Sequence, residues 1–298
     1  MPSRFLLQSR RRGMTTANSA LRGKSLHRSK APAVGARGFI VAIGGDGKAA
    51  PKAAILRRFA ELCGGSRAHI AIISAGSDDE DLGAGYERAF REFGVNRVST
   101  SNFENRADCE TARDDSLGGV DGVFLIGSDP VRLSETLSAT PVAQQIGRRN
   151  ARGMHVAGVS AGAAFLPRQM IAAGKSGTTP RADIVELAPG LCLIDHLVID
   201  QHFRHQDRLG RMLMALTYNP HAVGIGLDPD TAAFIGPDQK LQVVGTGGIT
   251  VVDTSQLRHS AIHPDRLHAP VSMIGLHLDI LVEGNVYDMS AHLASIER

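Results

Sequence analysis

One stretch limits the fold more than any other part of the sequence: Val-Ala-Gly-Val-Ser-Ala-Gly-Ala-Ala-Phe, residues 156–165. An apolar run from Met154 to Val159 predicts a short buried strand, and it stops at Ser160 in the pattern Gly-x-Ser-x-Gly. Small residues follow, and apolar ones then recur at helical spacing as far as Met170. This pattern is typical of a nucleophile elbow, in which the chain turns sharply from strand to helix.

In such an elbow Ser160 sits in a strained, exposed position that only small neighbours permit. The helix begins directly after it, so the amide of Ala161 is free to face a developing oxyanion. An ordinary glycine-rich turn between a strand and a helix has the same local pattern, so the rest of the chain must distinguish the two.

A histidine follows a second apolar strand further along the chain. The strand is expected at residues 197–199, and Asp-Gln-His-Phe comes directly after it. Active residues of an open parallel sheet collect at the carboxyl ends of its strands, so we expect His202 to lie on a strand next to that of Ser160 and to act as its base. The competing histidines are His196, His205 and His221, and His205 is expected to be a solvated surface residue.

Further segments surround this pair in a fixed order. They are Ala42–Gly45, Gly127–Asp129, Gly158–Ala163, Ser176–Arg181, Pro189–Leu191, Asp200–Phe203 and Arg208–Arg211. Together they cover roughly residues 38 to 253, and the chain thereby resembles the cyanophycinase and peptidase E family of serine peptidases. The Asp-Gln-His-Phe block and the arginines after it are similar to the cyanophycinase branch.

Strands alternate with helices over the first half of the chain, which predicts right-handed βαβ units and an α/β fold. Strands are expected at residues 39–43, 69–73, 95–99, 120–126 and 154–159, and helices at 51–62, 80–93, 109–116 and 132–149, the last one broken near Pro141. The glycines at 44–47 are expected to form a structural turn beside the active site. Short strands at 222–227, 231–235, 241–244, 249–252 and within 272–283 predict an antiparallel extension of the sheet. The resemblance implies a three-layer αβα domain of the class I glutamine amidotransferase-like kind, with a mostly parallel central sheet and its nucleophile elbow at Ser160.

The resemblance also implies the remaining site residues. An oxyanion would be met by backbone amides from Ala161 and from the turn at Gly127 and Ser128. The substrate would be bound by Asp129, Arg181, Asp200, Gln201, Arg208 and Arg211. Arginines can hold carboxylates through paired hydrogen bonds, although a solvated basic helix face is the commoner fate of Arg208 and Arg211.

Four features depart from the family's pattern. Ser128 stands where the family usually has a glycine, and it keeps the backbone amide. Pro130 stands where the family usually has a glutamine, and Gln206 where it often has another arginine. The loop 174–179 holds no carboxylate where the family tends to place the acid of the triad. A histidine without that partner loses control of its tautomer, which can lower the rate by orders of magnitude. The sequence leaves open whether Asp183, Glu186 or Asp200 takes this role, or whether a neutral acceptor such as Thr178 does.

The resemblance implies a serine peptidase that cleaves the β-Asp-Arg polymer cyanophycin into β-aspartyl-arginine dipeptides, without a metal or an organic cofactor. Two alternatives stay open: a hydrolase of another isoaspartyl or acyl substrate, and a non-catalytic member that only binds. The expected partner is a peptide-like acidic polymer. The residues leave the oligomeric state open, a homodimer included.

Charge divides the chain into two parts. Residues 1–37 are rich in arginine and serine and carry no Asp or Glu. We expect them to be a disordered leader that packs against nothing, either dispensable or similar to a transit peptide, ahead of a single domain at 38–298. The remaining chain is mildly acidic, which gives nucleic-acid binding little support, and it has no apolar run long enough to span a membrane. The three cysteines are odd in number and lack metal spacing, which indicates reduced thiols and a cytoplasmic location.

Overall fold

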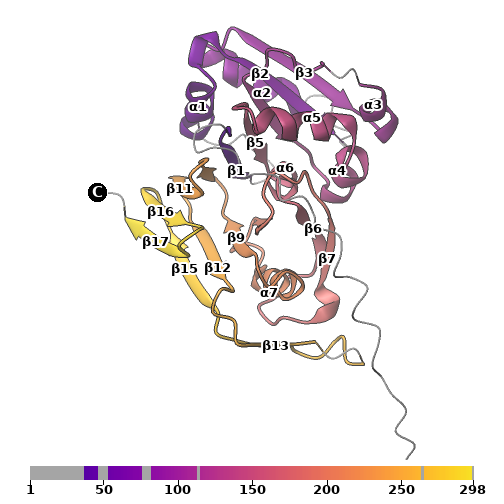
Figure 1. Ribbon diagram of the computed structural model, residues 1–298, viewed down its shortest axis with the longest axis vertical. Helices are drawn as coiled ribbons and strands as arrows, with labels where there is room; N and C mark the ends of the chain where they lie inside the picture. Colours follow the sequence, from indigo (N-terminus) through magenta and orange to yellow (C-terminus); the bar gives the residue numbers. More distant parts are fainter. Residues whose placement is uncertain (1–36, 46–52, 76–81, 113–114, 263–264, 297–298) are drawn as a thin grey trace, which may run out of the picture. The chain divides into compact units, whose positions relative to one another are not determined.

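The computed structural model describes residues 37–45, 53–75, 82–112, 115–262 and 265–296. A nine-stranded sheet runs through the domain in the order β17-β16-β11-β10-β1-β5-β4-β2-β3 (Figure 1). Its strands are β1 (Ile40–Gly44), β2 (His69–Ala75), β3 (Arg97–Phe103), β4 (Gly122–Ile126), β5 (His155–Val159), β10 (Thr231–Ile235), β11 (Lys240–Gly245), β16 (Asn285–Asp288) and β17 (Leu293–Ile296). The five strands from β1 to β3 in this order pair in parallel, and the other four pair antiparallel.

Helices cover both faces of the parallel part. On β1 the residues alternate between the two hydrophobic clusters, Ile40 and Ala42 on one side and Val41 and Ile43 on the other. The helices are α1 (Ala53–Leu62) and α2 (Leu82–Glu92) on the second side, and α3 (Arg106–Thr111), α4 (Pro130–Leu137), α5 (Pro141–Asn150) and α6 (Ala161–Phe165) on the first. The predicted three-layer α/β fold is thereby confirmed, as is the break at Pro141, where a proline opens α5.

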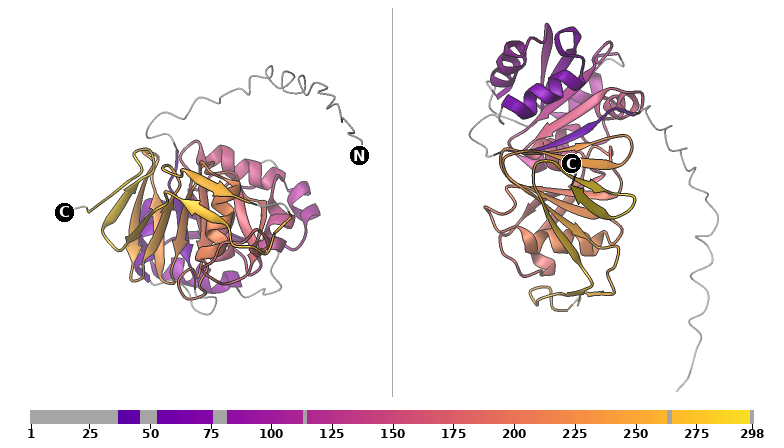
Figure 2. Two further views of the ribbon diagram at one scale, coloured as in Figure 1. Left: turned by 90° about the horizontal axis from the view of Figure 1, so that it is seen from below. Right: turned by 90° about the vertical axis from the view of Figure 1, so that its left-hand side faces the viewer.

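A second sheet has no backbone hydrogen bonds to the first among the described strands. It has four strands in the order β15-β12-β9-β8, with bounds β8 (Leu197–Gln201), β9 (Val223–Leu227), β12 (Ile249–Asp253) and β15 (His277–Leu281). One of its faces joins the core shared with the large sheet, and α7 (Leu209–Tyr218) covers the other (Figure 2). The prediction that the strands after residue 222 all extend one sheet is therefore wrong, since β9 and β12 belong to this second sheet.

A hairpin of β6 (Gln169–Gly174) and β7 (Val185–Pro189) follows the elbow helix, and a smaller one of β13 (His259–Ala261) and β14 (Ser272–Ile274) lies near the end of the chain. The sequence predicted helical spacing through Met170, whereas α6 ends at Phe165 and Met170 lies in β6. Pro167 explains the difference, because a proline has no backbone N–H to donate within a helix and its ring clashes with the preceding turn.

Arg37, the last residue of the predicted leader, contacts the described part of the chain. Arg37 donates from its guanidinium to the carbonyl of Gly236 (3.2 Å), so the segment that packs against nothing cannot extend to residue 37. Residues 1–36 lie outside the described part, and the prediction of a dispensable leader and a single domain stays a prediction. Among the described helices, none is long and apolar enough to cross a membrane.

Candidate active site

Ser160 occupies a strained turn between β5 and α6. Its backbone angles are φ 55° and ψ −119°, a positive-φ conformation that costs energy for any residue with a side chain. Two glycines make the turn possible. A Cβ on Gly158 would lie 2.3 Å from the carbonyl oxygen of Gly162, and one on Gly162 would lie 2.5 Å from that of Leu125. The nucleophile elbow is thus built by close backbone approaches that only glycine allows.

Gly45, which follows β1, lies directly against the serine. The rest of the turn that was predicted beside the active site at residues 44–47 lies outside the described residues, apart from Gly44 at the end of β1. A Cβ on Gly45 would come within 3.2 Å of the Ser160 Cβ and 3.7 Å of its Oγ. The backbone N–H of Ser160 donates to the carbonyl of Ile43 (3.0 Å), which ties the two strand ends together. Gly45 therefore leaves the space in which the serine hydroxyl stands.

Replacing Gly45 with alanine is expected to lower kcat/KM by about ten- to a hundredfold, because a displaced nucleophile loses its alignment with the substrate. Thermal unfolding should change little, since the new methyl group meets chiefly the serine side chain. Gly147→Ala is the matched control. A Cβ at this position would meet nothing within 4 Å, and alanine has a higher helix propensity than glycine within α5. Steady-state kinetics that are equal for the two variants would show that Gly45 does not shape the site.

The serine hydroxyl donates to the side-chain carbonyl oxygen of Gln201, at 2.6 Å. Gln201 is the last residue of β8 and is buried, and this contact joins the elbow to the second sheet. The sequence predicted that the strands of Ser160 and His202 are neighbours in one parallel sheet. That prediction is wrong, because β5 pairs with β1 and β4, whereas β8 pairs with β9.

His202 follows β8 directly and is partly exposed. Its φ of 51° turns the chain out of the strand, and its carbonyl accepts from the N–H of Gln206 (3.1 Å). The predicted base therefore stands one residue beyond Gln201, whose side chain contacts the predicted nucleophile. Its assignment as the catalytic base remains a prediction.

A buried carboxylate that the sequence reasoning missed lies beside this turn. Gln201 and Leu227 are register partners in β8 and β9, so His202 and Asp228 are the residues that follow a matched pair. Asp228 is 2% exposed, and its Oδ2 accepts from Arg204 Nε (2.5 Å) and from the N–H of Gly248 (3.1 Å). Its Oδ1 has no hydrogen-bond partner among the described residues. The signal was available, because Asp228 comes directly after a predicted strand.

Asp200, Arg208 and Arg211 form an ion cluster under the end of β8. Asp200 is 1% exposed, and Arg211 holds it with two hydrogen bonds, from Nε to Oδ2 (2.7 Å) and from Nη2 to Oδ1 (2.5 Å). Arg208 approaches the same carboxylate at 3.4 Å and donates to the main-chain carbonyl of Gln201 (2.7 Å). It also contacts Gln206, the residue that departs from the family's pattern. Burial, followed by the charge of Arg211, lowers the pKa of Arg208 from its usual value.

These contacts show what the cluster does in this state. The two arginines neutralise a carboxylate that would otherwise be buried alone, and they fix the backbone from which Gln201 projects. Arg211 is 7% exposed, so its guanidinium faces the protein and not the solvent. Binding of substrate by Asp200, Arg208 and Arg211 stays a prediction.

The residues predicted to donate to an oxyanion follow two neighbouring parallel strands, β4 and β5. Ala161 is the first residue of α6, so its N–H has no acceptor inside the helix. Gly127 follows β4, which pairs in parallel with β5, and Ser128 comes next. Asp129, predicted to bind substrate, caps α4: its Oδ1 accepts from the N–H groups of Val131 (2.8 Å) and Arg132 (3.1 Å).

Pro130 is the first residue of α4, a position where the missing N–H costs no helical hydrogen bond. The departure from the family's glutamine is thus well accommodated by the fold.

The loop without a carboxylate lies against the chain that follows His202. The N–H of Gly177 donates to the carbonyl of Asp207 (2.6 Å), and the N–H of Gly210 donates to that of Gly177 (2.8 Å). Thr178, next in sequence, is exposed.

Two of the carboxylates considered as substitutes are engaged elsewhere or exposed. Asp183 accepts from His268 Nδ1 (2.9 Å) and Lys175 Nζ (3.3 Å), and the bond from His268, more than that from Lys175, lowers the pKa of Asp183. Arg181 is its further neighbour, with Nε 3.8 Å from Oδ1. Glu186 is exposed on β7. Among the described residues, no three His, Cys, Asp or Glu gather closely enough to hold a metal ion.

Known proteins are similar to this chain over most of its length. The model of peptidase family S51 matches residues 40–243. A cyanophycinase from Nostoc sp. is 39% identical over 254 residues, which are 84% of this chain and 85% of that protein. One from Synechococcus elongatus is 35% identical over 264 residues, 87% of this chain and 81% of that one. The crystal structure of a peptidase from an acI-B1 Actinobacterium covers 85% of this chain and 97% of its own with a TM-score of 0.61, and at 19% identity it supports the fold.

Proposed function

Because the chain belongs to peptidase family S51, we propose that it hydrolyses the β-Asp-Arg polymer cyanophycin and releases β-aspartyl-arginine dipeptides. It is a peptidase of the serine type. The observation that carries the proposal is the strained elbow at Ser160, whose hydroxyl meets the Asp-Gln-His-Phe block. Relatives named cyanophycinase match along most of the chain and support the choice of substrate.

The chemistry begins at the serine hydroxyl. In the resting state its proton points to Gln201, and an amide oxygen is too weak a base to take it. The hydroxyl must therefore turn from Gln201 toward His202 when substrate arrives, and His202 takes the proton as Oγ attacks the scissile carbonyl. The imidazolium then returns that proton to the leaving amine, and water hydrolyses the acyl-enzyme with the same base.

The developing oxyanion needs donors that are already in place. The N–H of Ala161 at the start of α6, together with an amide from Gly127 or Ser128, would supply them. We assign recognition of the polymer's charged side chains to the residues for which the family resemblance implies substrate binding. These are Asp129, Arg181, Arg208 and the cluster around Asp200. Gln201 is assigned a second role, the alignment of the free hydroxyl.

The acid that supports His202 can be tested at the loop. Thr178→Glu is expected to raise kcat on a β-aspartyl substrate by roughly tenfold or more, because a carboxylate stabilises the imidazolium that a threonine can only orient. The anchoring of the loop to Asp207 and Gly210 motivates this choice. Thr179→Glu, one residue away on the same exposed loop, is the matched control. If both variants turn over like wild type, the loop does not approach the histidine.

Asp228 is the competing candidate. Asp228→Asn is expected to lower kcat by orders of magnitude if its carboxylate supports His202. Arg204→Gln breaks the same ion pair but keeps the carboxylate, so it separates the two effects. Equal kcat for Asp228→Asn and Arg204→Gln would assign Asp228 to structure alone.

The proposed function itself is tested with purified protein on cyanophycin and on synthetic β-Asp-Arg oligomers, with release of the dipeptide followed by chromatography. Dipeptide that appears with wild type and not with Ser160→Ala supports it. Cleavage only of other isoaspartyl or acyl substrates would favour a related hydrolase.

A non-catalytic binding member is the second candidate. It is favoured by one observation, the hydrogen bond from Ser160 to Gln201, a group that cannot accept the proton in catalysis. Tight binding of the polymer without any hydrolysis, equal in wild type and Ser160→Ala, would establish it.

We also propose a cytoplasmic location, because the cysteines are expected to be reduced thiols. The cysteines of the described chain, Cys63, Cys109 and Cys192, form no disulfide. A homodimer is a further proposal, which sedimentation of the purified protein tests directly.

A further inference from the structure

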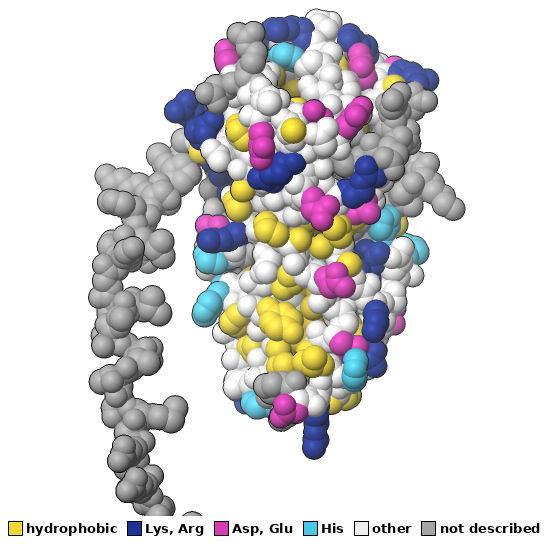
Figure 3. All heavy atoms as spheres, turned by 90° about the vertical axis from the view of Figure 1, so that its right-hand side faces the viewer, with side chains coloured by type: hydrophobic (Ala, Val, Ile, Leu, Met, Phe, Trp, Pro, Cys, Tyr) yellow, Lys and Arg dark blue, Asp and Glu magenta, His cyan; other side chains and the backbone are white. Residues whose placement is uncertain are grey.

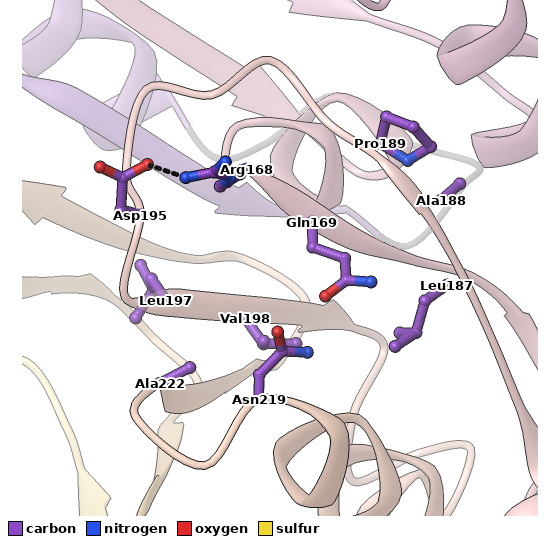
Figure 4. Close-up of a pocket in the computed structure, with 10 residues that line it drawn as sticks. All are labelled: Arg168, Gln169, Leu187, Ala188, Pro189, Asp195, Leu197, Val198, Asn219 and Ala222. Atoms are coloured by element: carbon purple, nitrogen blue, oxygen red, sulfur yellow. Dashed lines mark ion pairs between the residues drawn. The ribbon is translucent and has the colours of Figure 1, made fainter. Parts of the chain in front are cut away.

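A cleft lies at the opposite end of β8 from the serine. It opens between the β6–β7 hairpin and the first residues of β8, and it has a volume of about 370 Å³ (Figure 4). The segments that precede β6 and β8 are joined by an isolated parallel bridge between Pro167 and Ile194. Each strand then pairs with a different partner, β7 and β9, and the cleft occupies the space between them.

The cleft has an apolar floor and a polar rim. Leu197 and Val198 are each 2% exposed and form part of the floor, with Leu187 opposite them. Figure 3 shows the face on which β7 lies, where hydrophobic side chains gather over much of the lower half and charged ones stand around them. On the rim, Arg168 and Asp195 carry opposite charges at a distance of 3.8 Å.

The polar groups of the cleft have capacity for a ligand. The side chains of Arg168 and Asp195 are 71% and 62% exposed, and an exposed pair at this distance holds its members together only weakly. The Gln169 side-chain amide points into the cleft and makes no hydrogen bond to any described residue. Asn219 donates from Nδ2 to the carbonyl of Ala215 (3.0 Å), and none of the described groups donates to its Oδ1. One cation, one anion and two amides thus surround an apolar floor.

The strand β8 separates this cleft from Ser160. Val198 lies three residues before Gln201, which is about 10 Å at the rise of a strand. An extended chain advances by at most about 3.6 Å per residue, so a ligand needs at least about three steps to cover this distance. Three steps join four backbone residues, one at each site and two between them. Short substrates can occupy the site at Ser160 without reaching the cleft.

We propose that this cleft is a second, non-catalytic binding site for a β-aspartyl-arginine unit of the polymer, and that it holds the chain while another unit is cleaved at Ser160. The proposal rests on the proposed function. A β-aspartyl-arginine unit carries a guanidinium, a free carboxylate, an amide and a three-methylene stem. These groups match Asp195, Arg168, the amides of Gln169 and Asn219, and the apolar floor, in that order.

The first test measures binding with turnover removed. Ser160→Ala protein is titrated calorimetrically with β-aspartyl-arginine dipeptide, and two sites per chain are expected. Adding Arg168→Glu should weaken the second site by about tenfold or more, as the loss of a charge-assisted hydrogen bond predicts, and leave the first unchanged. Arg148→Glu, the same exchange on the exposed surface of α5, should leave both sites unchanged.

The second test compares substrates of different length on the enzyme with Ser160 intact. Arg168→Glu and Asp195→Lys should each raise KM for the long polymer by about tenfold, with kcat unchanged. Cleavage of an oligomer of two units should change by less than twofold. The double variant Arg168→Glu/Asp195→Lys restores one charge of each sign and should recover part of the loss.

The outcomes separate the two proposals. A single dipeptide site in Ser160→Ala, or equal effects of Arg168→Glu on long and short substrates, would overturn the second site. Wild-type protein that cleaves neither substrate would instead overturn the proposed function. The calorimetric titration still tests the second site in that case. If the dipeptide binds at two sites and Arg168→Glu weakens one of them, the cleft is a binding site.

Discussion

Ser160→Ala is expected to lower the rate of β-aspartyl-arginine release by at least about a thousandfold, because a Ser–His pair acts as a unit and the alanine has no nucleophile to replace it. The fold should persist. Among the described residues the hydroxyl makes one hydrogen bond, to Gln201, and losing it costs about 1 kcal/mol of unfolding free energy. Initial rates on the polymer and thermal unfolding of the same samples measure both effects.

Ser101→Ala provides the matched control. It removes the same hydroxyl from an exposed position on β3, at the far edge of the large sheet, and should change neither measurement. If Ser160→Ala instead releases dipeptide at the rate of Ser101→Ala, the serine is not the nucleophile and the chain is better described as a binding member of its family.

Arg211→Met is expected to give the largest loss of stability. It leaves the buried carboxylate of Asp200 with Arg208, at 3.4 Å, as its remaining cationic partner among the described residues, and breaking one side of a buried ion pair costs about 3–5 kcal/mol. For a domain of this size that corresponds to a decrease in Tm of roughly 10 °C. Activity should fall as well, because Asp200 Oδ1 accepts from the N–H of Gln201 (2.9 Å) and so holds the residue that contacts the nucleophile.

Two variants make this measurement decisive. Arg148→Met replaces an exposed arginine on α5 and should change the unfolding free energy by about 0.5 kcal/mol or less. Asp200→Asn/Arg211→Met removes both charges and should recover part of the loss, since no unpaired ion remains. Urea denaturation measures the unfolding free energy of each variant. If Arg211→Met is as stable as Arg148→Met, the cluster does not hold β8 in place.

Sequence alone located the elbow because its causes are local. The apolar strand, the serine and the glycines at 158 and 162 lie within a few residues, and the steric limits on that turn apply wherever the segment lies. The break at Pro141 was predictable for the same reason. The predicted continuation of the helix to Met170 was wrong. The apolar spacing there suits a helix, and it is Pro167 that ends it.

The contents of the site depended on more distant contacts. Asp200, Gln201 and His202 were placed correctly at a strand end, yet nothing in a short apolar run such as Leu197–Ile199 says which sheet it joins. Asp228 was overlooked because no motif marks it, and its relation to His202 exists only through the pairing of β8 with β9.

The sequence by itself therefore determined the α/β class, the strained serine and the strand-end position of the polar block, since periodicity and backbone sterics act over a few residues. Tertiary structure decided that β8 stands in a separate sheet, that Gln201 takes the serine's hydrogen bond, and that Arg211 is buried against Asp200. It also created the cleft between β6 and β8. These features arise where residues far apart in the chain meet, and burial and strand pairing select among partners that local pattern leaves equivalent.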